Sequence, residues 1–517
     1  MGGRVLAKGT SDAEHGSIDA VYRTFSRTLI VVVVVFTVVF AAELGLEWWA
    51  LGMPGESATS WAGVNNAKLV DLMSPLARAY NNVLAMLIAT IGLAIPLTAN
   101  MHTPKLIEMF LRDRLNQAVL FYMAFAAANT LWVAYMIGPE FAPMWAIRFA
   151  VAGALFGWAV LIPYFFYVVR FLDPSSILAR LNADVERAIE DVVGGKLHPD
   201  EGQRVVSERV HQIGTIVIKS LDRTDRGVAL EGVWLLKRLL DFHGARKERM
   251  PEGWFEVDRA DFVGLSADAL AIVKEERVFF ERKVLQQLYL GYQHAVTKAS
   301  DAVSSISDAH RVAALGAAQR GDEAALRLSL RYMNSFLRES VKLKHVHSLY
   351  DVFYQSRLLA TALAARTGLV PEMVTHLAEY AEAARANGLA FVPSFAAFDL
   401  AQIAAEARRV GVVRAADVID RVLAVPHERG GTLEPLVVEA KLKLGAMLTM
   451  LGADDDAARV RAALQGVPRE VIARCGRDLL AAPRCFHEVT DRQVDLRWLH
   501  PEERAPLEKL VASLAAE

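Results

Sequence analysis

The chain has little cysteine and almost no net charge. Its 517 residues include two cysteines, Cys475 and Cys485, which excludes a disulfide scaffold and a four-cysteine zinc site. Lys and Arg total 57 and Asp and Glu total 59, so the formal net charge is −2. Surfaces that bind nucleic acid need an excess of basic residues. The charge balance therefore predicts no nucleic-acid partner.

Sequence motifs for catalysis and metal binding are also missing. The stretch around Lys196 reads "VVGGKLH" and lacks the first Gly and the final Ser or Thr of a phosphate-binding loop, while "GESAT" lacks the last Gly of a nucleophile elbow. His345 and His347 are two residues apart, so on a helix they point in different directions, and surface or packing roles are favoured over metal ligation. We expect no catalytic residue, no metal site, no cofactor and no enzyme activity.

Apolar residues gather instead in four runs within the first third of the chain. The second, third and fourth runs carry no formal charge and are long enough for a helix to cross a bilayer about 30 Å thick. These four predicted spans are Leu29–Ala42, Ala79–Met101, Leu115–Pro139 and Phe149–Val169.

The first run is short for a span, which leaves two interpretations. It resembles the core of a signal peptide, with Ala41 and Ala42 near a cleavage site. The preceding tail is long and mixed in charge, however, and Arg27 and Glu43 can extend the usable helix by reaching into the interface. We favour an uncleaved anchor, which gives four membrane helices.

Basic residues predict the orientation of these spans. Arg4, Lys8, Arg23 and Arg27 precede the first span, and the short turn after the second span contains Lys105, Arg112 and Arg114. Because basic residues near span ends stay on the cytoplasmic side, both termini are expected in the cytoplasm.

That short turn carries a recognisable motif. The stretch beginning at His102 reads "HTPKLIEMFLRDRLNQAVLFYMAF" and is similar to the signature of a bacterial family of predicted membrane proteins, domain-of-unknown-function family 2254. The matching positions are Pro104, Phe110 to Arg114, Asn116 and Gln117. The resemblance covers about 74 to 167, and a weaker one begins at Val210. It implies an integral membrane protein without a settled activity, and we expect this protein in the bacterial inner membrane.

Polar and backbone-breaking residues in the spans are candidates for a pore. Asn82 and Thr90 lie in the second span, and Pro96 there frees the carbonyl of Gly92 from its usual hydrogen bond. No span contains an internal charged residue, which argues against a coupled pump. Gly153 and Gly157 form a small-xxx-small face in the fourth span, for which helix packing within one subunit is slightly favoured over a subunit interface.

The rest of the chain is predicted to be helical and cytoplasmic. We expect an all-α membrane protein with a tail at 1–28, a four-helix membrane domain at 29–172, membrane-proximal helices at 173–250 and a large helical domain at 265–517. Val370-Pro371 and Val392-Pro393 each begin a similar helix that ends near a Gly, at Gly388 and Gly411. This pattern favours a repeat-like helical array over an irregular bundle.

Two functions fit these features. The first is a homo-oligomeric channel or pore in the lipid bilayer, with the helical domain regulating it, because four spans are too few for a pore within one subunit. Its candidate residues are Asn82, Thr90, Gly92, Pro96, Arg112, Asp113 and Arg114. The alternative is a non-conducting membrane scaffold whose helical array recruits a cytoplasmic protein partner.

Overall fold

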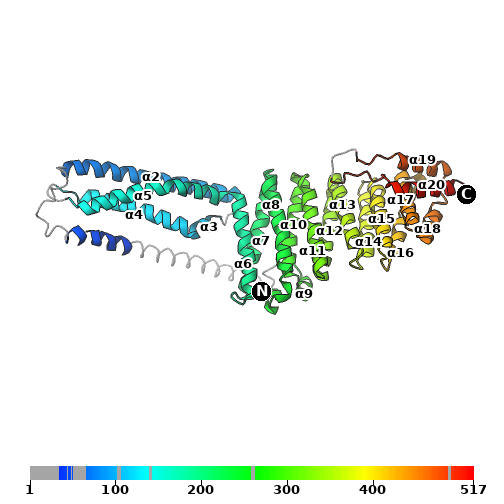
Figure 1. Cartoon of the computed structure of the whole chain (residues 1–517), viewed down its shortest axis with the longest axis horizontal. Coiled ribbons are helices and arrows are strands. Elements are labelled where there is room, and N and C mark those ends of the chain that lie inside the picture. The colour runs from blue at the N-terminus through cyan, green and yellow to red at the C-terminus, as the bar shows by residue number, and fades with distance from the viewer. Residues whose placement is uncertain are drawn as a thin grey trace, which may run out of the picture. The chain divides into compact units, whose positions relative to one another are not determined.

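The chain folds into two units of helices. The computed structural model describes residues 34–43, 45–47, 49, 66–101, 106–138, 142–257, 262, 264–486 and 491–516. Unit 1 is Met1–Asp173 and unit 2 is Pro174–Glu517. Figure 1 shows both units as bundles of helices, and among the described residues the only sheet is a two-stranded hairpin.

Unit 1 contains long apolar helices. Residues 34–43 and 45–47 are helical, and four further helices follow, namely α2 (Asn66–Met101), α3 (Leu106–Arg112), α4 (Arg114–Met136) and α5 (Met144–Leu172). Within the described residues, three helices are long and apolar enough to cross a membrane, over Lys68–Thr98, Arg114–Met136 and Met144–Leu172. They contain the second, third and fourth predicted spans, although α4 ends at Met136, before Pro139.

The first predicted span is described only in part. Residues 29–33 lie outside the described residues, and 34–42 are helical. This helix packs along α4 through aromatic rings, with Phe36 5.0 Å from Phe125 and Phe40 stacked 5.5 Å from Trp132 between ring centroids. The described part of the first run is therefore a helix of unit 1.

Small residues let the helices of unit 1 approach each other closely. Gly157 of α5 faces Tyr80 of α2, and a Cβ at Gly157 would lie 1.9 Å from the Tyr80 hydroxyl oxygen. That hydroxyl donates a hydrogen bond to Met123 Sδ at 3.0 Å. Tyr122 of α4 donates to the Gly153 carbonyl at 2.8 Å. The face formed by Gly153 and Gly157 thus packs inside one unit.

Unit 2 is a series of helices, most of which have one buried and one exposed side. The α-helices are α6 (Pro174–Val193), α7 (Pro199–Asp222), α8 (Arg226–Gly244), α9 (Ala267–Glu275), α10 (Phe279–Lys298), α11 (Ala302–Arg320), α12 (Glu323–Leu343), α13 (Val346–Leu363), α14 (Val370–Ala386), α15 (Val392–Arg409), α16 (Ala415–Leu423), α17 (Pro435–Met450), α18 (Asp454–Leu464), α19 (Arg469–Ala481) and α20 (Pro501–Ala516). Short 3-10 turns lie at Lys247–Arg249 and Glu252–Phe255, and the strands β1 (Glu428–Arg429) and β2 (Thr432–Leu433) pair before α17.

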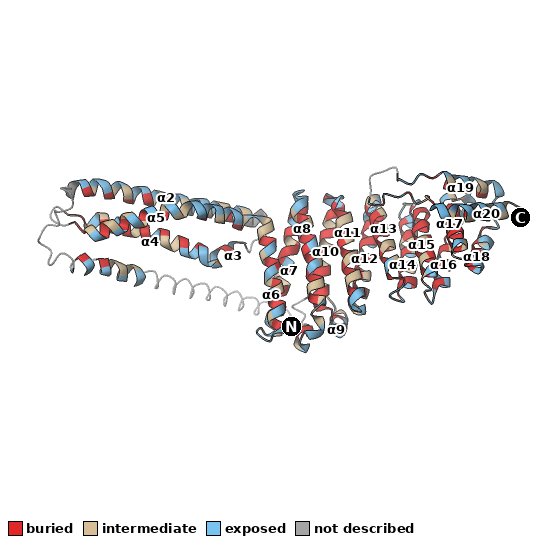
Figure 2. Ribbon diagram, viewed as in Figure 1, coloured by how far each residue is buried: buried red, intermediate tan, exposed pale blue. Residues whose placement is uncertain are grey.

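These helices form two layers. With α9 left out, each helix from α6 to α15 packs on the helix two places further along. One layer therefore contains α6, α8, α11, α13, α15 and α17, and the other contains α7, α10, α12, α14 and α16. Figure 2 shows buried residues on the facing sides of the helices and exposed residues on their outer sides. Stacked helical hairpins of this kind bury one continuous core.

Proline and glycine mark the ends of three of these helices. Pro371, Pro393 and Pro435 lie in the first turns of α14, α15 and α17. Backbone N–H groups in a first turn make no hydrogen bond within the helix, so a proline there costs none. Gly388, Gly411 and Gly452 follow the same helices with φ of 92°, 74° and 69°, which side chains rarely adopt. The Pro435 helix is a third copy of the pattern, separated from the others by α16 and the hairpin.

The segment after α8, over 244–257, packs against the helices through buried aromatic residues. Trp254 is fully buried and its indole Nε1 donates to His243 Nε2 at 3.1 Å. Gln203 of α7 donates to the Trp254 and Glu256 carbonyls at 2.8 and 2.7 Å. The expected segments 173–250 and 265–517 therefore form one unit.

Candidate functional site

The candidate pore residues of α2 lie on the exposed side of that helix. Asn82, Thr90, Gly92 and Pro96 are all exposed, and nothing comes within 4 Å of the position that a Cβ would take at Gly92. At 100° per residue they span an arc of about 160°, with Ala85 and Ala89 between them. Figure 2 shows α2 mostly in pale blue, the colour of exposed residues. The polar positions therefore face away from the core of unit 1.

The backbone of α2 adds a polar group to this exposed arc. Pro96 lies inside the helix and has no N–H, so the Gly92 carbonyl lacks its regular donor four residues on. Gly92 has no side chain to shield that carbonyl. An unpaired carbonyl facing hydrocarbon costs several kcal/mol, because lipid tails offer no hydrogen bond.

The inner side of α2 is closed by packing. Tyr80 is fully buried between Met123 and Gly157, and Leu69 and Met73 pack with α4 and α5 nearer the start of the helix. These contacts fill the space between α2, α4 and α5 with apolar and aromatic groups. A polar path along α2 would therefore run outside the described part of unit 1 rather than through it.

The Arg112-Asp113-Arg114 turn joins α3 to α4 and is closed by hydrogen bonds. Asp113 is the N-cap of α4, and its Oδ1 accepts from the Asn116 amide at 3.0 Å. Asn116 and Gln117 reach back to α3, donating to the Phe110 and Leu111 carbonyls at 3.2 and 2.7 Å. Asp113 thus has a structural role, whereas Arg112 and Arg114 are exposed.

Phe110 fixes the same turn to the end of α5. It is 1% exposed and meets Phe171 edge to face, with ring centroids 5.4 Å apart. The signature residues Phe110, Asp113, Asn116 and Gln117 therefore build one helix–turn–helix corner. Pro104 lies outside the described residues.

A buried acidic pair, Glu43 and Glu47, lies elsewhere in unit 1 and was not among the predicted site residues. Glu43 is 8% exposed and Glu47 is 3% exposed. Asn129 of α4 donates to Glu43 Oε1 at 3.0 Å, and Glu47 Oε1 accepts from the Ala146 amide at 3.1 Å and from the Trp145 amide at the start of α5. Glu47 thus caps α5, where a negative charge is favourable.

Acceptor atoms remain without partners around Glu43. Glu43 Oε2, Glu47 Oε2 and Asn129 Oδ1 are buried and have no hydrogen-bond partner among the described residues. Glu43 also lines an apolar cavity of about 520 Å³ with Val38, Leu46 and Phe149. Such oxygens can accept a proton or a donor group, but the described residues include no group of three His, Cys, Asp or Glu that could hold a metal.

A signal for this pair was present in the sequence. Glu43 and Glu47 are four residues apart and therefore share one face of a helix, and Asn129 is a polar residue inside a predicted span. Their contact joins positions 86 residues apart. The sequence shows both sides of this contact but not their pairing.

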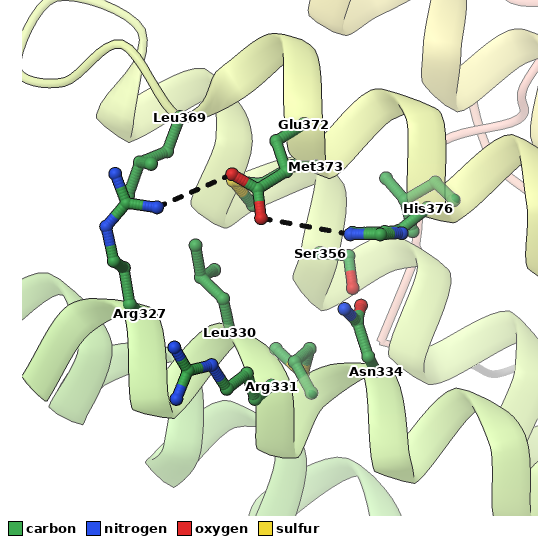
Figure 3. A pocket seen from close by; sticks show the side chains of 11 residues that line it. Arg327, Leu330, Arg331, Asn334, Ser356, Leu369, Glu372, Met373 and His376 are labelled. Carbon is green, nitrogen blue, oxygen red and sulfur yellow. Dashed lines mark ion pairs between the residues drawn. The ribbon is translucent and has the colours of Figure 1, made fainter. Parts of the chain in front are cut away.

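Figure 3 shows a pocket of unit 2 between α12 and α14. Arg327 lies 3.6 Å from Glu372, which is also 3.8 Å from His376, and both are ion-pair distances. The cavity measures about 80 Å³. Ligand pockets typically measure about 300–1,000 Å³, so this cavity has no room for an organic ligand. Its ion pairs link α12 to α14.

His345 and His347 have separate structural partners. His345 is the N-cap of α13, and its Nδ1 accepts from the Ser348 amide at 3.2 Å. His347 Nε2 lies 3.2 Å from Asp351 Oδ2. Burial, followed by the nearby His347, lowers the pKa of His345. The two rings do not share a partner.

Comparisons with known proteins agree with the membrane assignment. Residues 23–221 match the sequence model of a family described as "Predicted membrane protein (DUF2254)", which confirms the resemblance and extends it to both sides. No curated protein matches the chain. One solved structure, titled "Circular tandem repeat protein with novel repeat topology and enhanced subunit contact surfaces", has 13% identity and a TM-score of 0.32, covering 87% of this chain and 96% of that chain. The family match and the apolar helices indicate a membrane protein.

Proposed function

We propose that this protein is a homo-oligomeric channel of the bacterial inner membrane in which α2 helices of several copies line the path. Both termini and unit 2 lie in the cytoplasm in this arrangement, where unit 2 regulates opening. The observation that carries the proposal is the exposed arc of α2 with Asn82, Thr90 and the Gly92 carbonyl. We propose no enzymatic role.

The cost of polar groups in lipid supports an assembly. An amide, a hydroxyl and a backbone carbonyl on one exposed arc would each lose hydrogen bonds in hydrocarbon, at several kcal/mol for the carbonyl. Contact with water between copies removes that cost. Because Tyr80 and Gly157 close the inner side of α2, the water lies between copies rather than within one.

The charged turn has a distinct place in this proposal. Arg112 and Arg114 are exposed on either side of the cap residue Asp113, at the cytoplasmic end of the spans in the proposed orientation. They anchor the topology and raise the local concentration of anions at a pore mouth. Asp113 does not line the pore, since its carboxylate caps α4.

Planar-bilayer recording of the purified protein tests the channel. We expect unitary currents in wild type, a lower conductance in Asn82→Leu/Thr90→Val, and altered ion selectivity in Arg112→Ala/Arg114→Ala. Asn81→Leu is the matched control, because Asn81 is the same residue type one position away and donates to the Ala77 carbonyl of its own helix at 2.8 Å. Silence of an intact oligomer over voltage, tension and divalent-ion conditions would exclude the channel.

A membrane-anchored scaffold is the second candidate. It is favoured by the two-layer array of unit 2, because stacked helical hairpins present extended surfaces to protein partners. In that case the outer arc of α2 makes a dry contact between copies, and unit 2 recruits a cytoplasmic protein. Oligomers without currents, together with a partner bound to unit 2, would select the scaffold.

A further inference from the structure

A segment of unit 2 with two short turns lies against one layer of the helical array. It comprises residues 491–500, between α19 and α20, and is called the strap below. It contacts a backbone carbonyl of α13 and side chains of α15 and α17, three successive helices of the same layer. It also pairs with residues 484–486 through an antiparallel bridge at Val494. The strap thus occupies a surface that stacked helical hairpins commonly use for partners.

Arg492 anchors the strap to a buried carboxylate. Its Nη1 and Nη2 donate to Asp399 Oδ1 and Oδ2, both at 2.7 Å, and the two residues are 5% and 1% exposed. The guanidinium also lies over the Tyr354 ring, 5.2 Å from its centroid. A planar fork on a carboxylate and an aromatic face is how proteins recognise arginine in particular.

Lys443 of α17 holds the backbone of the strap further along. Its Nζ donates to the Leu496 carbonyl at 2.9 Å and to the Trp498 carbonyl at 2.5 Å. Burial beneath the strap lowers the pKa of Lys443 to about 8. These contacts hold the backbone carbonyls four and six residues after the arginine, in and just after the turn at 496–497. A peptide of another sequence that forms the same turn has carbonyls at these places.

The strap is attached by polar contacts and little apolar burial. Leu499 is its one buried apolar side chain, whereas Val494 is 43% exposed. A cavity of about 700 Å³ remains beside the strap, lined by Tyr354, Arg357, Lys443 and Trp498 among others. Arg492 Nε has no hydrogen-bond partner among the described residues although it is buried. Since apolar burial supplies most of the stability of a packed segment, this one is weakly held.

Asp399 keeps a positively charged neighbour without the strap. Arg357 Nε lies 3.1 Å from Asp399 Oδ1, so Asp399 faces a second guanidinium from its own array. Removing Arg492 leaves Asp399 paired with Arg357. The usual penalty for breaking a buried ion pair, about 3–5 kcal/mol, is therefore largely avoided.

We propose that the face of α13, α15 and α17 is a recognition groove for an arginine-bearing peptide segment of a partner protein, and that the strap fills it in the free protein. The partner presents an arginine to Asp399 and Tyr354 and backbone carbonyls to Lys443. The strap is then an internal competitor that sets a threshold for binding. This inference does not depend on conduction by unit 1.

A synthetic peptide of residues 491–500, labelled with fluorescein, tests the groove by fluorescence anisotropy with the full-length protein. We expect weak binding to wild type, because the strap competes, and at least tenfold tighter binding to Arg492→Ala, in which the strap is released. The same peptide with Arg492→Ala should bind neither protein. Trypsin should also cleave after Arg497 faster in the Arg492→Ala protein than in wild type.

Two further variants distinguish binding in the groove from a general loss of packing in unit 2. Arg497→Ala is the matched control, because Arg497 is on the strap but lies 3.6 Å from the strap's own Asp495; its peptide affinity should equal that of wild type. Asp399→Asn added to Arg492→Ala should abolish binding, with circular dichroism confirming the fold. Absence of peptide binding to a folded Arg492→Ala protein, or binding that persists in the double variant, would overturn the proposal.

Discussion

Glu43 and Asn129 are joined by a hydrogen bond between buried side chains in a unit made of apolar helices. Replacing Asn129 by Leu leaves Glu43 without its donor, and we expect the free energy of unfolding to fall by about 1–3 kcal/mol. With Glu43→Leu already present, the same replacement should cost less than about 1 kcal/mol, because no polar group is then stranded. Denaturation followed by tryptophan fluorescence measures this cycle. Equal costs in the two backgrounds would mean that the pair is not coupled.

Glu281 makes the stability of unit 2 depend on acid pH. Burial by itself would raise its pKa, but His243 Nδ1 at 3.1 Å and Lys247 Nζ at 3.3 Å lower the pKa to about 2 from 4.5. The folded state therefore holds the ionised carboxylate, which contributes stability above pH 4.5 that is lost as the pH falls toward about 2.

A neutral replacement of Glu281 tests this contribution. Glu281→Gln should lower the free energy of unfolding by about 3 kcal/mol at pH 7, and the difference from wild type should shrink as the pH falls from 4.5 to 2. Thermal unfolding at a series of pH values gives the measurement. Glu275→Gln, an exposed residue of α9, is the control, and a pH-independent difference for Glu281→Gln would contradict the role of its charge.

Gly157 sets how closely α2 and α5 approach each other. In Gly157→Ala the new methyl group would lie 1.9 Å from the Tyr80 hydroxyl oxygen, so a helix must shift and stability should fall by about 1–3 kcal/mol. Gly153→Ala is the matched control on the same face, because the nearest atom there is 3.7 Å away and the change should be within about 0.5 kcal/mol. Melting temperatures of the two variants compare them directly, and equal losses would show that the Tyr80 contact does not limit the packing.

Helices were easier to predict than their contacts. Apolar length alone indicated α2, α4 and α5, because a span must be long and uncharged. Pro371 and Pro393 indicated where two helices begin, since proline favours a first turn. The cap role of Asp113 was missed, because a charged turn between two spans also suits a topology anchor.

Long-range pairs explain most of what the sequence did not reveal. Arg492 and Asp399 are 93 residues apart, and only the stacking of α13, α15 and α17 brings the strap to the carboxylate. The basic residues and Pro251 of the segment 244–257 are typical of a solvated loop, but Trp254 and Phe255 in it are buried. The composition of a loop therefore predicts its exposure poorly when a few aromatic residues anchor the loop to the core.

At the scale of the whole molecule, the outer arc of α2 predicts contact between copies. Ala89 lies on that arc and is exposed, so Ala89→Trp places a bulky ring where neighbouring α2 helices would meet and should dissociate the oligomer. Phe166→Trp is the control, because Phe166 is 66% exposed on α5 and away from the arc. Native mass spectrometry from detergent gives the subunit number of each variant. If Ala89→Trp keeps the wild-type mass while Phe166→Trp reduces it, copies meet through α5 and not through α2. The polar groups of the α2 arc would then have to bind lipid headgroups or another protein.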